Sequence, residues 1–305
     1  MTQSNGTRKL IDIADLDVIF LTYDEPKKDE FWIKIKNMGP WAQRVDGVKG
    51  SDAAHKAAAA ASGTDRFILI DGDNIPDAEF FNLQLELDDT NRDCVFRWRA
   101  RNVVNGLMYG NGGLSCWTRD FVSNMRTHEA TDGRAETQVE FCFDPRYWAM
   151  HDCYSTTYPN QTPFQAWRAG FREGVKMCLD RGTKPELSEF KQRVHNRNMD
   201  RLTIWQSVGA DDPNGFWSIY GARMGTYMTM LDSDWDYTSV QDFDELERLW
   251  QLCQYDNADN CTEYGNILRR QLGLTIVDMD PEDSAFFKYH YRSNFANQGI
   301  MTRDQ

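Results

Sequence analysis

Two aspartates separated by one glycine, Asp71-Gly72-Asp73, are the residues of this sequence whose types and spacing best fit a chemical role. They end the apolar run 67–70, which is typical of a short buried strand. Ligands of open α/β sheets bind at the carboxyl ends of the strands, and a glycine there allows backbone and ligand to approach closely. Adjacent carboxylates repel each other unless a cation lies between them, so the pattern predicts an Mg²⁺ or Mn²⁺ site for a phosphorylated ligand. The structural alternative is an Asp-Gly-Asp-Asn turn that only caps the strand.

The segments before these acids predict alternating strands and helices. Residues 17–23 form an apolar strand, 31–36 a short helix, and 44–50 a second strand that ends in a glycine turn. The alanine-rich segment 53–61 is strongly helical and leads into the central strand. This order predicts a parallel, nucleotide-binding half-sheet.

The rest of the chain divides into a strand-rich and a helix-rich part. Residues 94–100 alternate apolar and basic side chains, which predicts a strand with one buried face, and 109–119 predict a glycine-rich turn followed by a strand. From residue 184 onward the periodicity is helical. We therefore predict an α/β domain over 1–182, with a twisted, mainly parallel sheet flanked by helices, and a helical C-terminal region over 183–305.

The composition narrows the class of protein. The 305 residues are 41% hydrophobic, enough for a sizeable core, and the net charge of −13 disfavours unspecific binding to nucleic acid or to membranes unless basic residues cluster locally. The sequence contains no run of about 18 apolar residues, so it predicts no membrane span. The N-terminus lacks the apolar core of a signal peptide. We expect a cytoplasmic protein without a membrane partner. The seven cysteines are scattered and form no C-x-x-C pair, so we expect reduced core residues rather than disulfides or zinc ligands.

A resemblance to a known family emerges from the order of these motifs. No G-x-G-x-x-G, P-loop or G-x-S-x-G motif is present. The order of strand, glycine turn, helix with alanine, histidine and lysine, and then 68–73 resembles the nucleotide-sugar-binding half of GT-A fold glycosyltransferases, in which an Asp-x-Asp pair ends the central strand. The stretch 109–114 is similar to the glycine-bearing loop that follows in that fold. The resemblance covers residues 15–155 and extends to phage-encoded members, which would act in the host cytoplasm.

The resemblance implies a donor, a metal and their ligands. Asp73 would bind Mn²⁺ or Mg²⁺ and bridge it to the diphosphate of a nucleotide-sugar, here expected to be UDP-linked, while Asp71 would lie at the ribose or behind the metal. His151 is the candidate for a further metal ligand, oriented by Asp152, and the alternative is a hydrogen-bonded core histidine. Gly112 and Gly113 would adopt positive φ or allow the sugar close approach.

Further residues of the same region are candidates for the nucleotide and for catalysis. His55, Lys56, Arg44 and Lys49 could contact the nucleotide, although surface or packing roles explain each of them equally. An inverting transfer needs a carboxylate that deprotonates the acceptor hydroxyl, and Glu140 and Asp120 follow the glycine stretch, with ordinary surface acids as the alternative. A retaining enzyme would need no such base.

The acceptor is suggested by aromatic and basic residues that interleave at 96–101 and 167–172. Stacking rings and arginines in this pattern could bind a nucleic acid, so a 5-hydroxymethylpyrimidine in phage DNA is one predicted acceptor. The net charge favours a glycan, a protein or a small molecule instead. Two other classes stay open: a silent nucleotide- or glycan-binding module, and a nucleotidyltransferase, which would normally show a glycine- and lysine-rich loop absent from residues 1–30.

Overall fold

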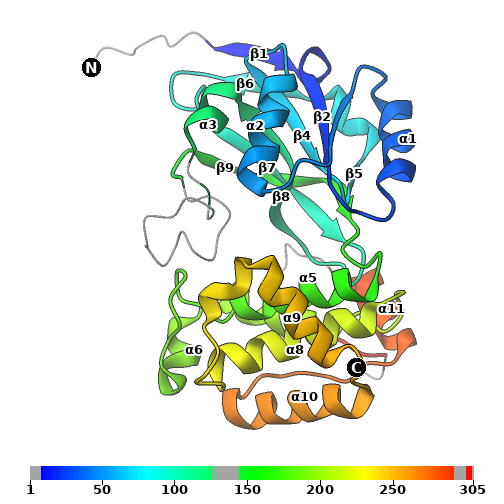
Figure 1. Ribbon diagram of the computed structural model, residues 1–305, viewed down its shortest axis with the longest axis vertical. Helices are drawn as coiled ribbons and strands as arrows, with labels where there is room; N and C mark the ends of the chain where they lie inside the picture. The colour runs from blue at the N-terminus through cyan, green and yellow to red at the C-terminus, as the bar shows by residue number, and fades with distance from the viewer. Residues whose placement is uncertain (1–7, 126, 128–143, 292–299, 304–305) are drawn as a thin grey trace. The chain divides into compact units, whose positions relative to one another are not determined.

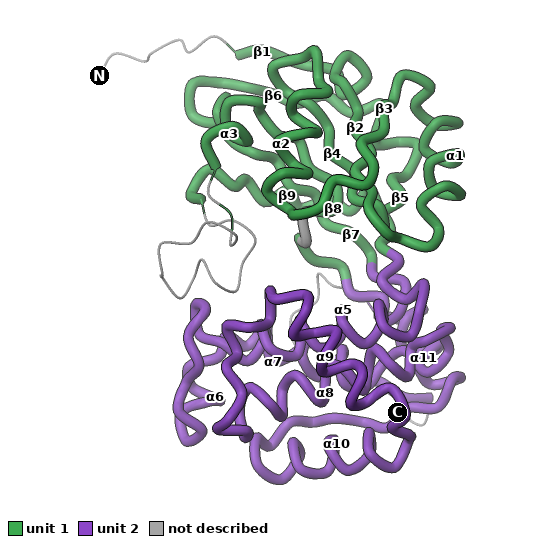
Figure 2. Tube along the Cα trace, viewed as in Figure 1, with its two compact units in different colours: residues 1–101, 108–130, 142–157 green, residues 102–107, 131–141, 158–305 purple. Residues whose placement is uncertain are grey.

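The computed structural model describes residues 8–125, 127, 144–291 and 300–303. The chain folds into two compact units (Figure 2). The first unit comprises the described residues of 1–101, 108–130 and 142–157, and the second those of 102–107 and 158–305. The chain therefore enters the helical unit after Thr157, earlier than the boundary expected near residue 182. The reason is that the first long helix after Thr157 packs on a helix of the second unit rather than on the sheet.

The first unit is a mixed α/β structure built on a seven-stranded sheet (Figure 1). The strand order is β3-β2-β4-β8-β7-β9-β5, and β1 and β6 form a separate antiparallel pair. The strands are β1 Lys9–Asp12, β2 Asp17–Thr22, β3 Gln43–Asp46, β4 Arg66–Asp71, β5 Asn74–Pro76, β6 Gln84–Leu87, β7 Val95–Asn102, β8 Met108–Thr118 and β9 Tyr147–Thr157. The helices are α1 Lys28–Met38, α2 Ser51–Ala61 and α3 Arg119–Asn124. A 3₁₀ turn, Ala78–Asn82, follows β5.

The predicted order of strands and helices around the central strand is confirmed. Strand β2 pairs in parallel with both β3 and β4, and α1 and α2 make the two connections. The buried residues of β4, from Phe67 to Ile70, form the middle of the sheet. Helix α2 packs on β2 and β3 through its small buried alanines. The carboxyl ends of three parallel strands thus meet at one edge of the sheet.

The expectation of a mainly parallel sheet is wrong, because half of the sheet is antiparallel. Strand β8 lies antiparallel to β4 on one side and to β7 on the other, and β5 lies antiparallel to β9. The cause is connection length: β7 and β8 are joined by 103–107 alone, which suffices for a hairpin but not for the crossover that a parallel pair needs.

The glycine-rich stretch is strand rather than turn. It lies within β8, where the pairing with β7 is irregular: Arg97 lies opposite Ser115, but Arg99 lies opposite Gly110. Between these two pairs, the single residue Trp98 of β7 spans the stretch 111–114 of β8, which forms a wide bulge next to β4. Such bulges are frequent beside functional sites because they release backbone from the sheet ladder.

The second unit is helical. Its helices are α5 Pro163–Lys176, α6 Phe190–Arg193, α7 Asn196–Trp205, α8 Gly215–Met230, α9 Phe243–Cys253, α10 Ala258–Leu272 and α11 Pro281–His290. The core centres on Trp167, Phe171 and Tyr220, where α5 meets α8. The segment between α5 and α8 is not one continuous helix but a 3₁₀ turn, Leu187–Glu189, followed by α6 and α7. Within the described part of the chain, no helix is long and apolar enough to span a membrane.

Candidate functional site

The candidate site lies at the carboxyl edge of the parallel strands β2, β3 and β4. Register places Leu21 beside Asp71 and Thr22 beside Asp46, so the ends of the three strands bring their polar residues together. This is the edge at which the alternation of strands and helices predicts a ligand site.

Three carboxylates gather around Gly72 at this edge. The pKa of Asp71 is raised to about 7, chiefly by burial and then by the charges of Asp73 and Glu25, with the Arg97 charge acting in the opposite direction. The Glu25 carboxylate lies directly over Gly72, since a Cβ on that glycine would stand 2.6 Å from Cδ and Oε2 of Glu25. A side chain at position 72 would displace the Glu25 carboxylate, so glycine here allows the close approach of an acid rather than an unusual φ.

Asp73 is held by a hydrogen bond from the end of β9. Thr157, at the end of β9, donates its hydroxyl to Asp73 Oδ2 at 3.3 Å. The next residue, Asn74, begins β5 and lies opposite Thr157. The Asp71-Gly72-Asp73 segment thus connects two strands of the sheet, which fixes its backbone at both ends.

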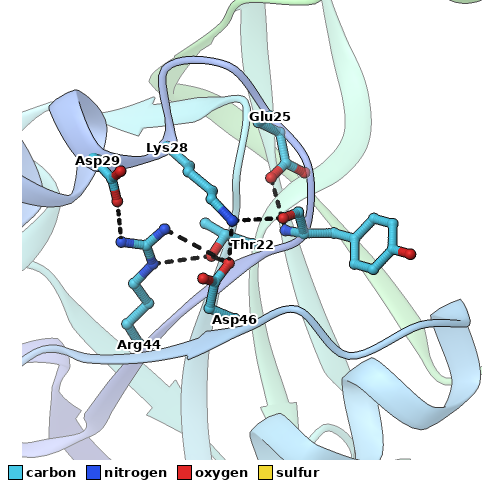
Figure 3. A network of polar contacts seen from close by, with 7 residues as sticks. Thr22, Glu25, Lys28, Asp29, Arg44 and Asp46 are labelled. Carbon is cyan, nitrogen blue, oxygen red and sulfur yellow. Dashed lines mark hydrogen bonds and ion pairs between the residues drawn. The ribbon is translucent and has the colours of Figure 1, made fainter.

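A polar network continues from Glu25 to the ends of β2 and β3 (Figure 3). Glu25 Oε2 accepts from the backbone N–H of Tyr23 at 2.8 Å, and Lys28 Nζ donates to Tyr23 O at 2.6 Å. Lys28 also donates to Asp46 Oδ1 at 2.8 Å, which lowers the pKa of Asp46. The backbone of Tyr23 is thereby held at both its N–H and its carbonyl, while the residue is 46% exposed.

Arg44 is part of this network and Lys49 lies near it. Arg44 donates to Thr22 Oγ1 at 3.0 Å and pairs with Asp29 at 2.6 Å, so its cation is neutralised within the protein (Figure 3). Lys49 is in the loop between β3 and α2, at the same edge.

His55 and Lys56 have partners within the first unit. His55 Nδ1 lies 2.8 Å from Ser51 O, and its ring packs edge-on against Trp117 with centroids 5.5 Å apart. Lys56 pairs with Asp52 one helical turn away at 2.6 Å. The structure supplies packing and surface partners for both residues, and a contact with nucleotide stays a prediction.

Of the other predicted metal and catalytic residues, His151 and Asp120 do not lie at the acids. His151 lies on β9 six residues before Thr157, about 20 Å along an extended strand, and it contacts Arg99 at 3.4 Å. It is therefore not brought to Asp73. Asp120 lies in the first turn of α3, which follows the end of β8 opposite Arg66, the amino-terminal end of β4. That is the edge of the sheet remote from Asp71. Glu140 lies outside the described residues.

Of the two predicted glycines, Gly113 is buried in β8, directly before Leu114, which lies opposite Ile70. Gly112 precedes it in the same strand. The bulge thus runs alongside Asp71, as a close-approach role requires, although it is not the expected loop. Positive φ is observed elsewhere, at Gly47 and Gly50 in the loop that carries Lys49.

Sequence reasoning missed Glu25 and misassigned Arg97. Glu25 is not among the residues that the sequence predicts for the site, although an acid just past the end of a neighbouring parallel strand is a usable signal. Arg97 was grouped with surface arginines, because alternation gives the face of a strand but not what crosses it.

The acid cluster is not a complete metal site by itself. In the described ranges, no group of three or more histidine, cysteine, aspartate or glutamate side chains is arranged to hold a metal ion. Mg²⁺ commonly uses only one or two carboxylates and takes its other ligands from substrate phosphates and water. Asp71 and Asp73 can supply those two carboxylates, and the raised pKa of Asp71 is what a cation would reverse.

Comparisons with known proteins add little. No protein-family model and no curated protein matches the chain. Among solved structures, the crystal structure of HddC from Yersinia pseudotuberculosis aligns with 50% of this chain and 76% of its own, at 14% sequence identity and a TM-score of 0.29. A similarity this weak carries no argument about fold or function. The class that fold and site define is a mixed α/β unit with an acidic ligand edge, followed by a helical unit.

Proposed function

We propose that the protein is a metal-dependent glycosyltransferase with a GT-A-like first unit, which moves a sugar from a nucleotide-sugar to a hydroxyl acceptor. The observation that carries the proposal is the crowding of Asp71, Asp73 and Glu25 around Gly72 at the carboxyl edge, where burial and mutual repulsion raise the pKa of Asp71 to about 7. Such a cluster is costly without a cation and becomes favourable when a cation binds a phosphorylated ligand there.

Each residue of the edge has a role in this proposal. A bound Mn²⁺ or Mg²⁺ would neutralise the charge that develops on the departing nucleoside diphosphate. Asp71 and Asp73 would hold the ion, and Thr157 orients Asp73. Glu25 and Lys28 fix the backbone of Tyr23, so that its exposed ring is available to stack on a nucleobase.

A panel of nucleotide sugars, UDP-linked sugars among them, tests the proposal. With Mn²⁺, the protein should release nucleoside diphosphate from one of them, and EDTA should abolish the release. Asp73→Asn should lower the rate at least ~100-fold, as loss of a charge-stabilising group does. Asp120→Asn is the matched control at the other edge of the sheet and should retain the wild-type rate.

Other outcomes identify the competing classes. Binding of nucleotide without turnover of any donor would indicate a binding module. Formation of pyrophosphate from a nucleoside triphosphate and a sugar phosphate would indicate a nucleotidyltransferase. Either result would overturn the glycosyltransferase proposal.

Modified DNA is the acceptor that the surface of the first unit favours, as a second part of this proposal. Arg99 and Arg101 lie on the same face of β7, and His151 of β9 contacts Arg99. These residues form a local basic face in a chain of net charge −13. A polyanion can approach such a chain only through a face of this kind.

A further inference from the structure

Arg97 lies on the same face of the sheet as Asp71, two strands away, and its charge lowers the pKa of Asp71. It lies opposite Ser115 of β8, and Ser115 lies opposite Leu69 of β4. Directly paired residues share a face of a sheet, and Asp71 follows Leu69 by two residues, so the side chains of Arg97 and Asp71 lie on the same face. The irregular stretch of β8 begins directly after the Arg97–Ser115 pair.

The guanidinium of Arg97 is positioned by an aromatic ring and forms no ion pair with the described residues. It stacks on the ring of Tyr147, with 4.8 Å from Cζ to the ring centroid. Its Nε is buried and has no hydrogen-bond partner in the described part of the chain. None of the ion pairs between described residues involves Arg97.

Neighbouring cations of the first unit differ from Arg97. Lys28 and Arg44 are paired with Asp46 and Asp29, as described above. Arg66 is buried and donates to the carbonyls of Cys94 and Arg92. Of these four cations, Arg97 alone combines a side chain held against a ring, a buried N–H without a partner among the described residues, and a position on the same face of the sheet as Asp71.

We propose that Arg97 is a substrate-binding residue that contacts the diphosphate of the donor. This inference rests on the proposed glycosyltransferase function and assigns a residue to it. Guanidinium groups bind phosphate oxygens with two parallel N–H bonds, and stacking on Tyr147 holds the plane of the fork. The acids would contact the diphosphate through the cation, and Arg97 would contact it directly.

The Arg97 guanidinium would act on the leaving group of the transfer, the nucleoside diphosphate. The bond between the anomeric carbon and the diphosphate oxygen breaks, and its electron pair passes to that oxygen. The acceptor oxygen bonds to the anomeric carbon, and the acceptor proton passes to a base or to solvent. Arg97 transfers no proton; it stabilises the negative charge on the diphosphate.

Calorimetric titration in Mn²⁺ with UDP, and with uridine as the ligand without phosphate, tests the assignment. Arg97→Gln should weaken UDP binding roughly 10- to 100-fold, the effect of losing a charge-assisted contact, and leave uridine binding unchanged. The UDP affinity of Arg97→Lys should lie between those of Arg97→Gln and the wild type, because lysine keeps the charge but cannot form the two parallel hydrogen bonds of a guanidinium group. Arg119→Gln, at the start of α3 and so at the edge of the sheet remote from Asp71, is the control and should bind UDP like the wild type.

The outcomes separate this inference from the function beneath it. If the wild type binds UDP and Arg97→Gln binds it equally well, Arg97 is not a phosphate ligand, while the proposed function stands. An equal loss of UDP and uridine binding by a variant with lowered thermal stability would assign Arg97 to the fold and overturn the inference. If the wild type binds neither UDP nor GDP with Mn²⁺, the proposed function and the inference fall together.

Discussion

At the scale of single residues, Asp71 connects the chemistry of the site to stability. Its pKa is raised from 3.8 to about 7 in the folded protein, so the folded state holds the proton more tightly than the unfolded chain. Protonated Asp71 stabilises the fold fully below about pH 3.8, and this contribution is lost as pH rises through about 7. The difference amounts to about 4 kcal/mol at most.

We therefore expect Asp71→Asn to raise the thermal stability of the metal-free protein at pH 8 and to change it little at pH 4.5. Thermal melts of wild type and variant, both in EDTA, measure this difference. Subtracting the two profiles removes the carboxyls whose pKa is lowered, such as Asp46 and Asp144, which act in the opposite direction with pH. If the melting temperatures of wild type and variant changed in parallel with pH, the pKa of Asp71 would not be raised in the folded protein.

The same residue distinguishes a metal site from an acidic turn. A divalent cation can offset the repulsion among Asp71, Asp73 and Glu25 only when they are ionised. Mn²⁺ should therefore raise the melting temperature of the wild type more at pH 8 than at pH 5. Asp71→Asn should show little response at either pH.

Residues adjacent in sequence were the predictable part of this site. Asp71 and Asp73 share one strand end, so their nearness follows from local structure alone. Glu25 reaches them because β2 pairs with β4, and Arg97 because β8 lies between β4 and β7. Both depend on strand order, which no local pattern contains.

At the scale of elements, the second unit depends on a close crossing of α5 and α8. A Cβ at Gly170 or Gly174 would meet the carbonyl oxygens of Ser218 and Ala222. From the other helix, a Cβ at Gly221 or Gly225 would meet those of Trp167 and Phe171. The two helices thus touch backbone to backbone, and glycine is the residue that permits it.

The sign of a glycine-to-alanine change tests this crossing. In an exposed helix, alanine would stabilise by about 1 kcal/mol. Here Gly221→Ala should destabilise the protein by about 3 kcal/mol, because backbone atoms cannot move aside as a side chain can. Denaturant unfolding measures the change. Gly110→Ala, where a Cβ would meet nothing within 4 Å, is the control and should be nearly neutral.

Elements were easier to predict than their arrangement. The apolar run of β4 and the alanines of α2 determine those elements locally, and both lie where the sequence predicts them. The glycines of β8 were misread as a turn because glycine signals backbone freedom, which a bulged strand and a loop use equally. The domain boundary was misplaced because α5 carries no local mark of the unit it packs in.

At the scale of the whole molecule, the distribution of basic residues determines which surface can bind DNA. Sequence alternation grouped Arg97, Arg99 and Arg101 with Arg168 and Arg172. In the structure, Arg172 donates to Gln241 at 2.9 Å and Arg168 lies over the rings of Phe164 and Phe243, all within the second unit. Arg97 lies on the same face of the sheet as Asp71. Of the described arginines in these two segments, Arg99 and Arg101 therefore stay available to a polyanion, together with His151.

The basic face of Arg99, Arg101 and His151 predicts how transfer to DNA depends on salt concentration. If modified DNA is the acceptor, transfer to it should fall steeply with added salt, because each neutralised phosphate releases counterions. Arg99→Gln and Arg101→Gln should each flatten the logarithmic salt dependence by about one unit, and donor hydrolysis without DNA should be unaffected. Arg172→Gln is the matched control and should leave the slope unchanged. Initial rates on 5-hydroxymethylpyrimidine DNA between low and physiological salt measure these slopes. An unchanged slope in the Arg99 and Arg101 double variant would remove DNA as the acceptor and favour a glycan, a protein or a small molecule, which the net charge of −13 does not repel.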